Sequence, residues 1–81
     1  MVENLNLPKD LMMGAVLLHV TGQNEIEVEN YRGILLYTDE HIRLSIKDGQ
    51  LDITGRSLQI VYYTNSDMKI TGLILQISYL M

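Results

Sequence analysis

The chain contains few residues that could do chemistry, and they are not arranged for it. Neither His19 nor His41 has a second histidine or a carboxylate at a spacing typical of a metal site. His41 follows two acidic residues and is predicted to be solvated in a turn, whereas His19 is predicted to be partly buried in a strand. The chain has no Cys, which excludes thiolate metal sites and cysteine nucleophiles, and it lacks nucleotide-binding and serine-nucleophile motifs. We therefore expect a protein that is not an enzyme and needs no metal or cofactor.

Three glutamates form the sharpest charge feature. Glu25, Glu27 and Glu29 alternate with Ile26 and Val28, so that the carboxylates line one face of a predicted strand, about 7 Å apart. Such a row could form a calcium rim or a docking surface for a basic partner. The alternative, which we favour, is the solvated face of a strand whose charge prevents unwanted edge pairing.

The aromatic residues of the chain are all tyrosines. In a strand, Tyr62 and Tyr63 point to opposite faces, which places one in the core and the other at the surface. Tyr63 together with Val61 is predicted to form a protein-contact patch, because tyrosine combines a large apolar area with a polar tip. The alternative is an exposed tyrosine that has no partner.

The elements that position these residues are β-strands. Residues 41–47 and 50–54 alternate between apolar and polar, and a helical period fits neither. The connections are too short for parallel returns, so neighbouring strands must be antiparallel. We expect an all-β fold of about seven antiparallel strands in a small two-layer sandwich or partly open barrel, with strands near residues 14–21, 24–30, 33–37, 41–47, 50–55, 57–64 and 68–79.

Glycines mark the turns and bends of this arrangement. Asp48-Gly49 predicts a hairpin, and Gly55-Arg56 predicts another turn, since the inward face switches there. Gly72 is predicted to be a bulge or bend inside one long C-terminal strand that passes from one layer to the other. The runs 34–37 and 73–75 are apolar on both faces, which predicts cover by a second layer or another subunit.

Composition indicates one domain, residues 1–81, in which segment 1–13 could form a short helical turn. The chain has 81 residues, 47% of them hydrophobic, and a net charge of −4, which argues against nucleic-acid binding. It lacks a signal sequence and an apolar run long enough to cross a bilayer, so we expect a cytoplasmic protein with no transmembrane segment. Its apolar strands favour a homo-oligomer. Two alternatives are a small β-barrel that binds nucleic acid, and a self-assembling β scaffold, since residues 53–62 and 70–79 share a pattern.

Several segments resemble a known family. Leu7-Pro8-Lys9-Asp10, the motif Glu29-Asn30-Tyr31-Arg32-Gly33-Ile34-Leu35, and the later segments 49–60, 70–74 and 77–79 together resemble the YabP/YqfC family of sporulation proteins, in particular its YqfC branch. The resemblance covers nearly the whole chain. It implies a small all-β protein made during endospore formation, which acts in the mother cell on envelope or cortex development.

The resemblance brings no catalytic residue with it, and it implies a non-catalytic protein that acts through protein–protein contacts with a partner still to be identified. Within the motif, Asn30, Tyr31, Arg32 and Gly33 are expected to form a tight connection between two strands. Gly33 would supply an unusual φ and Asn30 a local side-chain hydrogen bond. We favour this structural role over a binding site.

Overall fold

The computed structural model describes residues 14–81, which form antiparallel strands. The helical turn expected within residues 1–13 lies outside the described residues. None of the described residues belongs to a helix that could span a membrane. The strands are β1 (Leu17–Thr21), β2 (Glu25–Glu29), β3 (Gly33–Tyr37), β4 (His41–Ile46), β5 (Gly49–Tyr63) and β6 (Asp67–Leu80).

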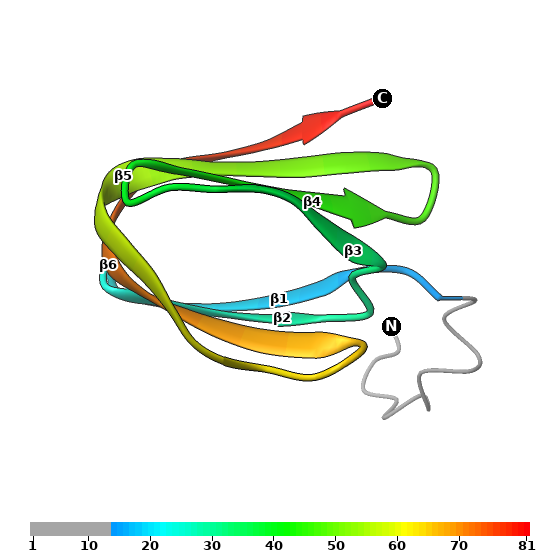
Figure 1. Ribbon diagram of the computed structural model, residues 1–81, viewed down its shortest axis with the longest axis horizontal. Coiled ribbons are helices and arrows are strands. Elements are labelled where there is room, and N and C mark those ends of the chain that lie inside the picture. The colour runs from blue at the N-terminus through cyan, green and yellow to red at the C-terminus, as the bar shows by residue number, and fades with distance from the viewer. Residues whose placement is uncertain (1–13) are drawn as a thin grey trace, which may run out of the picture.

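A single sheet folds over on itself to make two layers (Figure 1). Its strand order is β1-β2-β6-β5-β4-β3, and β5 and β6 are long enough to run through both layers. The upper layer holds β3, β4, the first half of β5 and the second half of β6, because β4 pairs only with residues 49–54 of β5. The lower layer holds the remaining halves with β1 and β2, because β2 pairs only with residues 67–71 of β6. The all-β, two-layer or partly open barrel prediction is confirmed.

The strand boundary predicted at Gly55-Arg56 is wrong, because residues 49–63 form one strand. The pairing of β5 with β6 shifts register between Arg56 and Gln59, so the strand bends there instead of reversing. The bend is fastened to the β3–β4 turn, where Gly55 N donates to the carbonyl of Glu40 (3.0 Å) and Leu58 N to that of Asp39 (2.8 Å). A bulge switches the inward face without a turn, and the alternation pattern alone does not distinguish the two.

The bend predicted at Gly72 is confirmed. Gly72 has φ 131°, within the continuous strand β6, and its amide donates to the carbonyl of Asn24 at 3.2 Å. A Cβ at this position would come within 2.5 Å of the Ser57 carbonyl oxygen. Only glycine therefore lets β6 cross from one layer to the other against the bend of β5.

The core between the layers follows the predicted alternation. Ile26 and Val28 on β2, and Ile42 and Leu44 on β4, are fully buried, whereas the polar residues between them face outward. The buried hydrophobic residues of the described chain are Ile26, Val28, Tyr31, Ile42, Leu44, Ile46, Leu51, Ile53, Leu58, Met68, Ile70 and Ile74.

Residues 14–81 do not provide the cover predicted over the apolar runs 34–37 and 73–75, except over Ile74. The exposed large hydrophobic residues are about as numerous as the buried ones: Val20, Ile34, Leu35, Leu36, Tyr37, Val61, Tyr62, Tyr63, Leu73, Leu75, Tyr79, Leu80 and Met81. They concentrate on β3 and on the second halves of β5 and β6, which are the open edges of the folded sheet.

Candidate interaction surface

β3 in the upper layer and the second half of β5 in the lower layer are both open edges, and the two segments do not pair with each other. Tyr37, at the end of β3, bridges the gap, since its hydroxyl accepts a hydrogen bond from Ile60 N at 3.0 Å. At the other end of the gap the Tyr31 hydroxyl donates to the carbonyl of Thr64. We call the line formed by Tyr31, Tyr37, Ile60 and Tyr63 the tyrosine seam. Single side-chain bonds, in place of a strand ladder, hold the two layers together here.

Tyr31 and Tyr63 give the tyrosine seam a buried and an exposed part. Tyr31 is buried, and its pKa is raised, first by loss of solvent and then by the nearby Tyr63 and Asp67. Tyr63 is 64% exposed, as predicted for a surface residue. Tyr63 pairs with Met68, which faces the core, so its ring lies on the inward side of an edge that no strand covers.

The expected core position of the second tyrosine is wrong. Tyr62 is half exposed and lies on the outer face opposite Lys69. Val61, which the register skips, forms a bulge and is also half exposed. Because the second half of β5 is a sheet edge, alternation sends the tyrosines to opposite faces without burying either of them.

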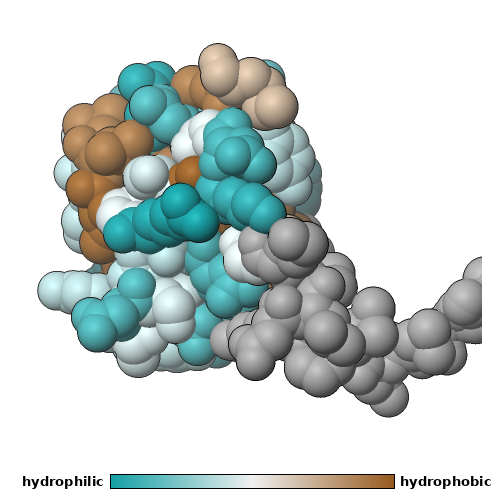
Figure 2. All heavy atoms as spheres, turned by 90° about the vertical axis from the view of Figure 1, so that its right-hand side faces the viewer, coloured by the Kyte–Doolittle hydropathy of each residue, from teal (hydrophilic) through white to brown (hydrophobic). Residues whose placement is uncertain are grey.

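The apolar surface continues along β3. Its residues Ile34, Leu35 and Leu36 are exposed together with Tyr37, and the pairing with β4 shifts between Ile34 and Leu36. Figure 2, which looks at the open end of the layers, shows brown apolar side chains gathered along one flank of the molecule. An apolar surface of this kind is typical of a protein-interaction site.

The motif Asn30–Gly33 connects β2 in the lower layer to β3 in the upper layer. Its backbone amides are bonded to both sides of the fold: Asn30 N donates to Ser66 O at 2.7 Å, and Arg32 N to Ser45 O at 2.7 Å. The prediction that Gly33 supplies the unusual φ is wrong, however, because Asn30 has the positive φ (71°) and Gly33 does not. The Asn30 side chain donates to the distant Ala15 carbonyl at 2.8 Å, and so fastens the start of β1.

The acidic residues lie on the outer face of the lower layer, as the alternation predicts. Glu25, Glu27 and Glu29 are partly exposed, and Lys69 on β6 approaches Glu25 at 3.2 Å. The hydrogen bond to Glu25 raises the pKa of Lys69. β2 lies between β1 and β6, so the glutamates do not protect a sheet edge as we expected. Both the acidic row and the pair Val61 and Tyr63 remain predicted contact residues.

Comparison with known proteins agrees with this geometry. The YabP family model matches residues 14–81, which are the residues of the folded sheet. The protein YqfC of Bacillus subtilis (strain 168), described as an uncharacterized protein, is 32% identical over 75 residues; the match spans 93% of this chain and 81% of YqfC. The chain belongs to the YabP family. No solved structure matches it.

This YabP-family chain holds a polar cluster that the sequence analysis missed. On the outer face of the upper layer, Asp52 Oδ1 lies 2.8 Å from Arg43 Nε and 2.8 Å from His41 Nε2. The hydrogen bond from Arg43 is the largest of the effects that hold the pKa of Asp52 below its ordinary value. His41 is therefore a strand residue with a carboxylate partner, not a solvated turn residue. The β4–β5 hairpin places Arg43 opposite Asp52. The pairing of these two side chains could therefore have been predicted from the register of the hairpin.

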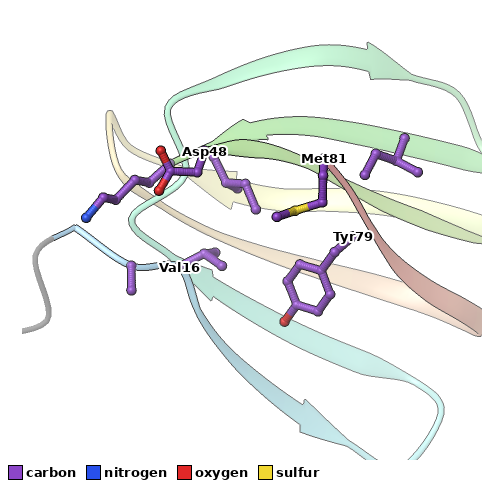
Figure 3. A pocket seen from close by; sticks show the side chains of 8 residues that line it. Val16, Asp48, Tyr79 and Met81 are labelled. Atoms are coloured by element: carbon purple, nitrogen blue, oxygen red, sulfur yellow. The ribbon is translucent and has the colours of Figure 1, made fainter.

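The second open side of this YabP-family fold lies between β1 and the end of β6. A hollow of about 460 Å³ lies there, lined by Ala15, Val16, Ile46, Lys47, Asp48, Tyr79, Leu80 and Met81. Figure 3 shows the ring of Tyr79 directed into the gap toward Val16, with Met81 above it. The lining is mainly apolar, with Lys47 and Asp48 at the hairpin, so the hollow suits an apolar side chain.

The potentially reactive groups of residues 14–81 are dispersed. No three of their histidine and acidic side chains lie close enough together to hold a metal ion. His19 lies on β1 in the lower layer, where it is exposed and not partly buried as predicted, and His41 lies on β4 in the upper layer. What the described surface offers chemically is apolar contact area with tyrosine hydroxyls.

Proposed function

We propose that this YabP-family protein is a non-catalytic component of endospore formation that acts by binding another protein through the tyrosine seam and β3. The exposure of so many large apolar side chains along these edges supports the proposal. Monomeric proteins rarely expose contiguous apolar surface of this kind unless it binds something. Tyrosine is enriched at such interfaces, since its ring gives contact area at low entropic cost.

The resemblance of the chain to sporulation proteins supports the biological setting. We place its action in the cytoplasm of the mother cell, in the development of the spore envelope or cortex, as a homo-oligomer. The polar Asp52 cluster lies on an outer face of the sheet, apart from the apolar hollow.

The test is a Tyr63→Ala substitution in the sporulating host, scored for heat-resistant spores and for the amount of the variant protein. We expect sporulation to fall to the level of a strain that lacks the protein, because the exposed ring is lost from the seam while the core is unchanged. Tyr62→Ala is the matched control: Tyr62 is similarly exposed but lies on the other face, beside Lys69. It should sporulate normally.

Two results would overturn the proposal. One is normal sporulation when the protein is deleted. The other is normal sporulation of the Tyr63→Ala strain at an unchanged level of protein, which would show that the protein does not act through the tyrosine seam.

A further inference from the structure

We infer that two copies of the chain associate through the second halves of their β6 strands, which pair antiparallel about a two-fold axis near Ser78. The inference rests on the part of the proposed function that makes the protein a homo-oligomer, and it names the surface. The second half of β6 pairs with β5 on one side, and within residues 14–81 no strand pairs with its other side.

This edge has neither of two features by which proteins protect a free strand, charged residues and proline. From Ile70 to Met81 there is no charged residue and no proline, and residues 76–80 keep an unbroken register against β5. Charges, prolines, bulges and short length are the usual means of preventing edge-to-edge pairing. The register of β6 against β5 skips Leu75, but residues 76–80 are regular and uncharged, and such an edge is a template for another strand.

The other edges are interrupted or carry a titratable side chain. β1 carries His19, and β3 has a bulge next to Leu35. The second half of β5 has a shifted register at Val61, and its Ile60 amide is already bonded to Tyr37. The second half of β6 is the edge best suited to continuous strand pairing.

Backbone direction sets the register of the pairing. The Leu80 carbonyl oxygen points at β5, where a Cβ on Gly49 would collide with it. Because backbone groups alternate in direction along a strand, those of Ile77 and Tyr79 point to the free edge. In the antiparallel pair centred on Ser78, Ile77 of one copy bonds Tyr79 of the other, and the two Ser78 residues face each other.

A second copy suits this edge because the edge is self-complementary. The unbroken segment 76–80 has Ser78 at its centre, so a two-fold axis there uses its whole length in both copies. Tyr79, which is 58% exposed, has its side chain on the inward face and lines the hollow. In the dimer it comes opposite Ile77 of the second copy, and the two hollows become continuous.

The contact area predicts a reversible dimer. A stable interface buries about 800 Å² on each partner, which is more than a short strand edge provides. Exposed apolar side chains beside the edge add to the contact area: Leu73, Leu75, Leu80 and Met81. We therefore expect a dimer that dissociates on dilution.

The first test is sedimentation equilibrium of the full chain over a range of concentrations. The Tyr79→Lys variant should raise the dissociation constant by about 30-fold or more, because a central tyrosine is replaced by an edge charge in both copies. The matched control is Tyr63→Lys, which changes a similarly exposed tyrosine in the tyrosine seam and should dimerise as the wild type does. Circular dichroism checks that both variants are folded.

The second test fixes the register. The chain has no Cys, so Ser78→Cys introduces a single thiol. Opposed residues of a non-hydrogen-bonded antiparallel pair lie close enough for a disulfide, and mild oxidation should yield a covalent dimer. Thr71→Cys, on the doubly paired half of the same strand, should not cross-link.

The outcomes separate this inference from the proposed function. A dimer abolished by Tyr63→Lys but not by Tyr79→Lys would overturn the β6 pairing and keep the homo-oligomer. A wild-type chain that is monomeric at every concentration would overturn the pairing and the homo-oligomer together, while the sporulation test with Tyr63→Ala would stand by itself. If the wild type is monomeric and a foreign strand peptide binds the β6 edge instead, the inference of a second copy also fails.

Discussion

The two halves of β6 both contain alternating apolar residues but differ in their surroundings. In the first half, Met68 and Ile70 are buried, and β2 and β5 flank the strand on both sides. In the second half, Leu75 and Tyr79 are more than half exposed, and only β5 flanks the strand. Apolar composition therefore predicts the strand in both halves but not its burial, which depends on a second neighbour and a facing layer.

The largest expected effect contrasts these halves directly. Ile70→Ala should lower the free energy of unfolding by about 2–5 kcal/mol, because it leaves a cavity between the layers. Leu75→Ala should change it by less than about 0.5 kcal/mol at low protein concentration, because that side chain is 57% exposed. Urea denaturation followed by circular dichroism measures both. Equal losses of unfolding free energy would mean that Leu75 is covered in the single chain, and the two halves of β6 would then not differ in burial.

The junction of the halves is the next position to probe. Gly72→Ala should destabilise the fold by about 2 kcal/mol or more, because alanine disfavours φ 131° and its Cβ would lie 2.9 Å from Leu58 Cα. The control is Gly33→Ala, since a Cβ on Gly33 meets no atom within 4 Å. Unfolding of the two variants in urea should differ clearly. A Gly72→Ala variant as stable as the control would show that β6 crosses between the layers without strain.

Tyrosines near the two halves offer a smaller contrast. Tyr31→Phe removes the hydroxyl that bonds Thr64 beside the β5–β6 turn, and it should lower the free energy of unfolding by about 1 kcal/mol. Tyr79→Phe removes an exposed hydroxyl and should have little effect. Thermal unfolding of the two variants measures the difference in stability. A larger loss of stability for Tyr79→Phe would show that the Tyr79 hydroxyl contributes more to the fold than the Tyr31 hydroxyl does.

The sequence predicts this fold well where its pattern is local. Alternation of Ile26 with Glu27, and of Ile42 with Arg43, identifies both the strands and their buried faces, because a side-chain period of two is a property of the strand itself. Gly72 could be recognised as a bend, since a face switch without turn residues requires one. Gly55 could not, because Gly-Arg suits both a turn and a bulge, and only the pairing with β6 decides between them.

The surface was less predictable than the strands. Exposure of Tyr63 followed from alternation, but exposure of Tyr62 depends on β4 ending its pairing at residue 54 of β5, which is a long-range property. The positive φ of Asn30 was assigned to Gly33 because glycine is the usual residue there. Asn30 holds it because its side chain reaches Ala15 across the fold, a contact that no local motif reports.

Asp52, on the strand that flanks the second half of β6, gives the smallest effect. Asp52 pairs with Ser78 on β6 and accepts hydrogen bonds from Arg43 and His41. Its pKa is lower in the folded chain than the ordinary 3.8, chiefly through Arg43. The folded state therefore gains stability above the unfolded pKa and loses it as the pH falls through the folded value.

Asp52→Asn should accordingly destabilise the protein by about 0.5–1 kcal/mol at neutral pH, and its difference from the wild type should shrink as the pH falls below about 3.8. Urea midpoints measured from neutral pH down to pH values well below 3.8 give the comparison, with Asp39→Asn in the exposed β3–β4 turn as the control. A difference that persists unchanged in acid would assign the loss to packing and not to charge.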